Sequence, residues 1–118
     1  MDKRKYPRIP LDADGWHAEI RNQLDGNLLG QVVNLSLGGM LILGSRVMAP
    51  ETLYQIEVIV STPEGDTQRF NAGVMILWSS EAESPNTVWA GVQIIDIGED
   101  DKSRLESLAS RATTALTD

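Results

Sequence analysis

Residues 54–78 read YQIEVIVSTPEGDTQRFNAGVMILW. Pro63 and Gly65 mark a turn in the middle of this stretch. On either side of the turn, apolar residues occupy every second position: Tyr54, Ile56, Val58 and Val60 before it, and Phe70, Ala72, Val74, Ile76 and Trp78 after it. Because successive side chains of a β-strand point to opposite faces, the stretch predicts two strands with one apolar face each. We expect Trp78, which ends the second series, to lie in the core.

The same period of two extends to four other segments. They are residues 16–21, 29–35, 40–43 and 88–94, and Asp25-Gly26 between the first two is a typical hairpin turn. After Ile97 the spacing of leucine and alanine changes to that of an amphipathic helix. Six short antiparallel strands followed by a helix predict a mainly β fold, either a barrel or a sandwich, with one C-terminal helix.

The composition excludes most catalytic chemistry. The 118 residues contain no cysteine and a single histidine, His17. A thiol nucleophile, a zinc–thiolate site and a disulfide framework are therefore excluded, and no second histidine completes a metal shell. Neither paired carboxylates nor a glycine-rich phosphate loop of the Walker or Rossmann type stands out. We expect one domain that is not an enzyme and needs no metal or cofactor.

The charge is distributed unevenly along the chain. Residues 1–8 contain four basic residues and one acidic residue, a balance of +3, whereas residues 9–118 contain six basic and 16 acidic residues, a balance of −10. An acidic body repels nucleic acid and anionic membranes, and it lacks the basic groove of a single-stranded nucleic-acid binder. No apolar run approaches the roughly 20 residues that span a bilayer or resembles a signal peptide. We expect a cytoplasmic protein without membrane insertion.

Two polar motifs are suited to recognising an anion or a guanine base. The first is RKYPR, in which Arg4 and Arg8 are four residues apart. Pro7 favours an extended backbone, so both side chains are expected on one side of the segment. An arginine fork fits a phosphate, or the O6 and N7 edge of guanine, with two hydrogen bonds. A solvated basic terminus is the alternative interpretation.

The second motif is NLSLGG, residues 34–39. Val33, Leu35 and Leu37 alternate with Asn34 and Ser36, so the two polar side chains are expected to project together from the face opposite the apolar one. Gly38 and Gly39 allow a ligand to approach the backbone closely. The alternative is an ordinary exit from a strand into a turn, where these residue types are common.

Together the two motifs resemble the signature of the PilZ domain family, bacterial receptors for cyclic di-GMP. That signature is RxxxR followed by [DN]xSxxG, and the chain has Arg4 to Arg8 followed by Asn34-x-Ser36-x-x-Gly39. The resemblance implies a six-stranded antiparallel β-barrel with a C-terminal helix over residues 16–118, preceded by a flexible tail over residues 1–15.

The resemblance also implies roles for residues. Arg4 and Arg8 are expected to bind guanine and phosphate, and the segment with Asn34, Ser36, Gly38 and Gly39 to contact a guanine or its adjacent backbone. Lys3, the basic residue before the first arginine, implies two intercalated ligands per chain. An aromatic residue at the barrel rim, Trp78, is a further possible ligand contact if it is not in the core.

The function that follows is a cyclic di-GMP receptor or adaptor. It would change conformation on binding the ligand and signal to an unidentified protein partner. The alternative is a PilZ-like interaction module that acts without nucleotide, for example in pilus or motility control.

Overall fold

The predicted hairpin in the middle of the chain is present. In the computed structural model, which describes residues 9–10, 15–45 and 48–117, β5 (Leu53–Ser61) and β6 (Thr67–Glu81) pair along their length. The other four predicted strands are also confirmed as β2 (His17–Asn22), β3 (Leu28–Leu35), β4 (Gly39–Gly44) and β7 (Val88–Asp96). The helix α1 (Glu99–Thr117) follows them. An additional strand of two residues, β1 (Ile9–Pro10), lies within the segment predicted to be a tail.

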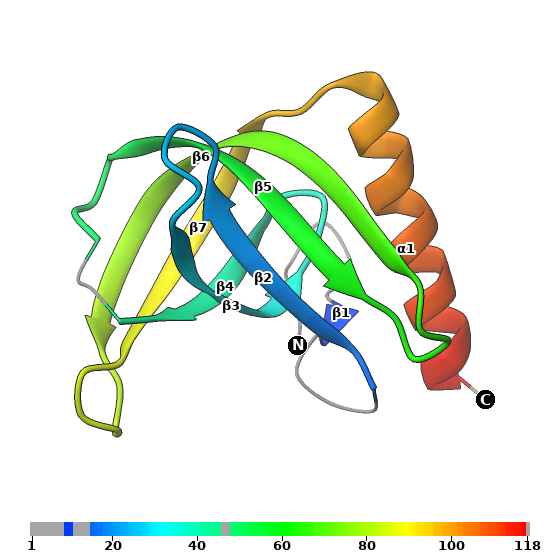
Figure 1. The fold of residues 1–118 in the computed structure, drawn as a ribbon, viewed down its shortest axis with the longest axis horizontal. Coiled ribbons are helices and arrows are strands. Elements are labelled where there is room, and N and C mark those ends of the chain that lie inside the picture. The colour runs from blue at the N-terminus through cyan, green and yellow to red at the C-terminus, as the bar shows by residue number, and fades with distance from the viewer. Residues whose placement is uncertain (1–8, 11–14, 46–47, 118) are drawn as a thin grey trace.

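The six longer strands close into a barrel. The hydrogen-bonded order is β3, β2, β5, β6, β7 and β4, and β4 pairs back onto β3, always antiparallel (Figure 1). β1 pairs with the C-terminal end of β3, beyond the residues of β3 that pair with β2. Because the sheet closes on itself, the fold is a six-stranded antiparallel barrel with one C-terminal helix and not a sandwich.

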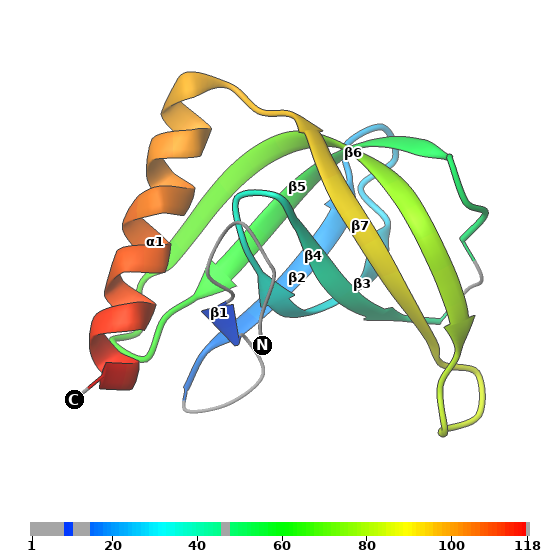
Figure 2. The same cartoon turned by 180° about the vertical axis from the view of Figure 1, so that it is seen from behind.

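The barrel interior and one side of α1 form the core. Leu105 and Leu108 of α1 are buried, and both views show the helix alongside the barrel near β1 (Figure 2). Acidic residues in the first turn of α1 complement the positive end of the helix dipole. No helix among the described residues has both the length and the apolar character needed to cross a membrane. The fully buried large side chains are Phe70, Ile20, Leu35, Met40, Ile42, Ile56, Ile76, Leu105, Leu108 and Val32.

One predicted core position is wrong. Phe70, Ala72, Val74 and Ile76 are buried as expected, but Trp78 is 45% exposed. The pairing of β6 with β7 is irregular between Ile76 and Trp78, so one extra residue is inserted there. A bulge of this kind turns the next side chain onto the opposite face of the sheet. Trp78 therefore lies on the outside of the barrel.

Candidate functional site

The structure divides the predicted site residues into two groups. Asn34 is the second-last residue of β3, Ser36 to Gly38 form the turn into β4, which begins at Gly39, and Trp78 lies on β6. Lys3, Arg4 and Arg8 lie outside the described residues. β1, which follows directly after Arg8 in the sequence, pairs with the strand that carries Asn34.

The turn between β3 and β4 is closed by hydrogen bonds of Ser36. The backbone N–H of Ser36 donates to Gly39 O at 2.8 Å, and Gly39 N–H donates back to Ser36 O at 3.3 Å. The Ser36 hydroxyl accepts a bond from Gly38 N–H at 3.2 Å and donates to Gly39 O at 3.4 Å. Both hydrogen bonds of the Ser36 hydroxyl are made within the turn, so this hydroxyl fixes the shape of the loop.

The prediction that Ser36 projects from a polar surface patch is therefore wrong. Ser36 is only 4% exposed, because it follows the last residue of β3 and its hydroxyl is bonded inside the turn. Within β3, the pairing with β4 shifts between Val32 and Asn34, so Val33 is an extra residue that breaks the simple alternation. As a result Val32 and Leu35 point into the core, while Val33 and Asn34 are both half-buried.

Gly39 is required where two backbones approach each other. A Cβ atom at this position would collide with the carbonyl oxygen of Val92 and lie 3.2 Å from its carbonyl carbon. On the same side, Ile94 N–H donates to Gly38 O at 3.0 Å. The turn is thus held against β7 as well as by its own bonds, and only glycine permits this contact.

A line of paired residues crosses the outer face of the barrel and connects Asn34 with Trp78. Pro10 pairs with Asn34, Asn34 with Leu41, Leu41 with Gly91, and Gly91 with Trp78. We call these five residues the outer row. The core residues that flank Leu41 and Gly91 point inward, so these two positions face outward. The fold therefore brings Trp78 onto the same face as Asn34, as its alternative role as a ligand contact requires.

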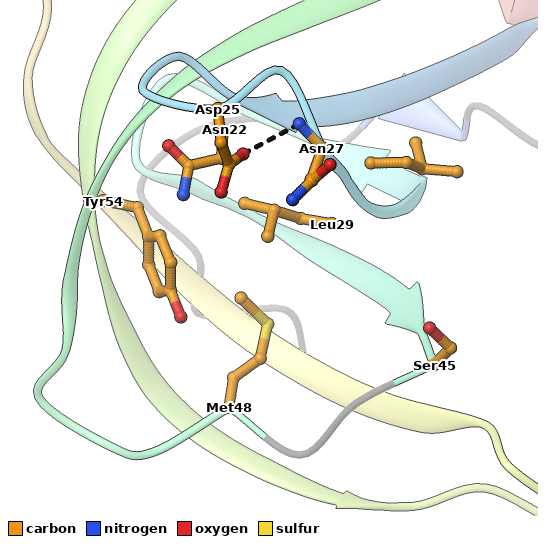
Figure 3. Close-up of a pocket in the computed structure, with 8 residues that line it drawn as sticks. Asn22, Asp25, Asn27, Leu29, Ser45, Met48 and Tyr54 are labelled. Atoms are coloured by element: carbon orange, nitrogen blue, oxygen red, sulfur yellow. Dashed lines mark hydrogen bonds between the residues drawn. The ribbon is translucent and has the colours of Figure 1, made fainter.

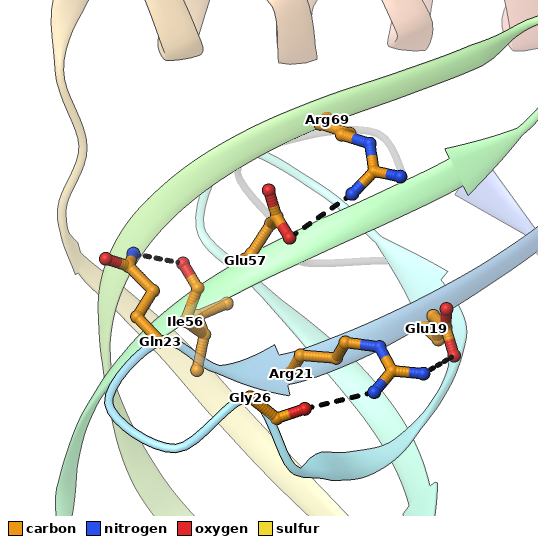
Figure 4. Close-up of polar contacts among 7 residues, drawn as sticks. All are labelled: Glu19, Arg21, Gln23, Gly26, Ile56, Glu57 and Arg69. Carbon is orange, nitrogen blue, oxygen red and sulfur yellow. Dashed lines mark hydrogen bonds and ion pairs between the residues drawn. The ribbon is translucent and has the colours of Figure 1, made fainter.

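Three arginines of the barrel and helix, Arg21, Arg69 and Arg104, already bind partners. Arg69 lies 3.5 Å from Glu57, and Arg21 bonds both Gly26 O at 3.0 Å and Glu19 at 3.4 Å (Figure 4). In α1, Arg104 lies 2.7 Å from Asp101. These three guanidinium groups are partly exposed and paired, so they are poor candidates for binding a phosphate.

A separate hollow of about 560 Å³ opens at the other end of β3. Tyr54 and Met48 line one part of it, and Asn22, Asp25 and Asn27 line another (Figure 3). No residue predicted for the site is part of this lining. Because β3 rises about 3.3 Å per residue, Leu28 beside the hollow and Leu35 beside the turn are roughly 23 Å apart. Residues of the hollow therefore provide controls for the candidate site.

Comparison with known proteins identifies the family. The family model described as PilZ domain matches residues 2–111. The chain belongs to the PilZ domain family. PilZ domains are non-catalytic modules that bind cyclic di-GMP, so membership confirms both the resemblance of the two motifs and the prediction that the chain is not an enzyme.

Solved PilZ structures have the same fold. The PilZ domain of YcgR from Escherichia coli, solved with c-di-GMP, has a TM-score of 0.69 at 16% identity, over 98% of this chain and 95% of that one. MrkH of K. pneumonia in its c-di-GMP complex has a TM-score of 0.70 at 16% identity, over 99% of this chain. MotI from Bacillus subtilis, an inhibitor of motility, has a TM-score of 0.67 at 14% identity, over 98% of this chain. The chain spans about half of the latter two, 54% and 53%. No curated protein matches it.

Proposed function

We propose that this PilZ domain is a receptor for cyclic di-GMP. The proposed site combines Lys3, Arg4 and Arg8 with the turn at residues 34–39, and Trp78 forms its far wall. Both signature motifs of the family are intact in the sequence. The observation that carries the proposal is the pairing of β1 with the end of β3, because β1 follows the first motif directly in the sequence and its partner strand leads into the second motif.

The register of β1 supports a ligand role for the second arginine. Ile9 pairs with Leu35 and Pro10 with Asn34 in antiparallel register. Arg8 directly precedes Ile9 in the sequence, and Leu35 directly precedes the turn that begins at Ser36. We therefore expect the Arg8 side chain to contact a ligand bound over this turn.

The charge distribution indicates that residues 1–8 supply the positive charge that binds the ligand phosphates. Cyclic di-GMP carries two phosphates, and Arg21, Arg69 and Arg104 are paired with carboxylates. Residues 1–8 have a charge balance of +3, whereas the remainder of the chain is acidic. Arginine binds phosphate and the guanine edge bidentately, which makes Arg4 and Arg8 the residues we expect to hold both parts of the ligand.

The turn supplies the complementary polar groups. Asn34 lies on the outer face, where its amide side chain can act as donor and acceptor towards a base edge. Ser36 does not face outward, and we assign it the role of holding Gly38 and Gly39 in the shape seen here. Small residues in this loop leave room for the ligand over the backbone.

We further propose that binding rearranges residues 1–10 around the ligand, and that a protein partner in the cytoplasm reads this change. Calorimetric titration with cyclic di-GMP, with GTP and GMP as competitors, tests the receptor function. GTP and GMP should compete poorly, because neither carries two guanines on one compact ring. If the protein does not bind cyclic di-GMP at all, the alternative is favoured, in which the module contacts its partner without nucleotide.

A further inference from the structure

The indole of Trp78 occupies the space where a side chain at position 91 would begin. A Cβ atom at Gly91 would lie 2.6 Å from Trp78 Cε2 and 2.9 Å from Cδ1, and it would collide with Nε1. The ring has thus crossed from its own strand, β6, to cover the backbone of β7. Trp78 can take this position only because residue 91 has no side chain.

Trp78 still presents a large surface to solvent. It is 45% exposed although its pyrrole edge lies against Gly91. The ring lies on the outer row, and only β4 separates Gly91 from Asn34. Neighbouring strands are about 4.8 Å apart, so Gly91 and Asn34 are roughly 10 Å apart across the barrel surface. A ligand bound at Asn34 that has two purine rings on one compact backbone can therefore reach the exposed ring of Trp78.

We infer that Gly91 is a positioning residue for the ligand site. It fixes the indole of Trp78 against the barrel, where the exposed part of the ring can stack on a purine of the bound nucleotide. This inference rests on the proposed function, because it assumes that cyclic di-GMP binds over the turn at residues 34–39. Gly91 acts only through Trp78 and does not itself contact the ligand.

Gly91 and Gly39 differ in the kind of atom that an added methyl group would meet. At Gly39 the obstacle is the backbone of Val92, which cannot move without disturbing the sheet. At Gly91 the obstacle is a side chain at the surface, which can swing outward. Gly91→Ala should therefore preserve the fold and displace the indole, so the variant separates positioning from stability.

The test is a double-mutant cycle of Gly91→Ala and Trp78→Ala, with cyclic di-GMP affinity as the readout. Base–aromatic stacking contributes enough that each single variant should weaken binding by about fivefold or more. The double variant should bind no more weakly than Trp78→Ala alone, because Gly91 has no effect without the indole. Gly98→Ala is the control, since a methyl group there meets nothing within 4 Å, and it should leave affinity unchanged.

A second measurement reports the position of the indole without ligand. The Nε1–H resonance of Trp78, assigned by its loss in Trp78→Phe, should shift in Gly91→Ala and not in Gly98→Ala. An unshifted resonance, an unchanged affinity of Trp78→Ala, or a Gly91→Ala effect that persists in the Trp78→Ala background would each overturn the inference while leaving the proposed function intact. If the unmodified protein does not bind cyclic di-GMP, the proposed function fails and the ligand role of Gly91 fails with it.

Discussion

Pro10 on β1 lies opposite Asn34 on β3. β1 follows directly after the first motif in the sequence, and its partner Asn34 begins the second motif, although the two motifs are far apart in the sequence. β1 has only two residues and a single described partner strand, β3. We therefore expect substitutions in the N-terminal segment to change ligand binding without changing the packing of the barrel core.

Arg4→Ala and Arg8→Ala should each weaken cyclic di-GMP binding. A bidentate contact to guanine or phosphate is worth about 1–3 kcal/mol, which corresponds to a roughly 5- to 150-fold loss of affinity. Thermal stability should change little, because neither residue belongs to the apolar pattern of the strands. Calorimetric titration of each variant measures the effect.

The matched control for these variants is Arg69→Ala. It removes the same charge from the protein, but from a guanidinium that is paired with Glu57 on the outer face of the barrel. It should bind cyclic di-GMP as the unmodified protein does. Unchanged affinity in both Arg4→Ala and Arg8→Ala, or an equal loss in Arg69→Ala, would contradict the proposed site.

Ser36→Ala should reduce stability and affinity together. The substitution removes the acceptor of Gly38 N–H within a buried turn. Loss of one such hydrogen bond lowers the free energy of unfolding by about 1 kcal/mol. Urea denaturation measures this change, with Ser107→Ala on the exposed side of α1 as the control. Ser36 would be a direct ligand contact instead if its loss weakened binding without any change in stability.

Gly39→Ala should destabilise the protein more than Gly98→Ala. Overpacking against a fixed neighbour costs about 1–3 kcal/mol, and here the neighbour is the Val92 carbonyl oxygen. Position 98 is open, and an added methyl group meets no atom within 4 Å. The midpoints of urea denaturation of the two variants give the comparison. Equal midpoints would show that β4 and β7 do not approach as closely as described.

The backbone amides of residues 4–6, 8 and 9 should exchange more slowly with solvent when cyclic di-GMP is bound. We expect this because the segment contains few apolar residues, so its ordering depends on charge-assisted bonds to the ligand. Hydrogen exchange followed by mass spectrometry measures the effect. Residues 27–29, beside the hollow at the other end of β3, should be unaffected. Full protection without ligand would mean that the site is preformed and that the proposed rearrangement does not occur.

The period-two pattern of the sequence was sufficient to predict the barrel strands but not the details of the site. The strands of the central hairpin, β5 and β6, have long runs in which apolar residues occupy every second position, and burial of one face makes this signal strong. β1 has two residues, too few to show a period. The bulge at Leu77 is defined by the partner strand β7, so alternation along β6 placed Trp78 on the wrong face. Ser36 lies beyond the end of β3, in a turn whose hydrogen bonds bury its hydroxyl, so strand alternation does not apply to it. The requirement for glycine at position 91 likewise appears only when β6 and β7 are paired.

We predict two ligands per chain on the basis of Lys3. A second cyclic di-GMP adds two phosphate charges, and an additional nearby cation reduces their repulsion. Lysine supplies this charge but lacks the planar fork of arginine. Lys3→Ala should shift the ratio towards one ligand per chain. Saturation of the unmodified protein at one ligand, at concentrations well above the dissociation constant, would refute this prediction.

The most direct test of the central claim is calorimetric titration of the unmodified protein and of the Arg4→Ala/Arg8→Ala double variant with cyclic di-GMP. We predict saturable binding to the unmodified protein and a loss of affinity of at least about 25-fold in the double variant, the combined effect of two bidentate contacts. The double variant should unfold at the same urea concentration as the unmodified protein. The absence of binding to the unmodified protein, or equal binding to both, would contradict the account.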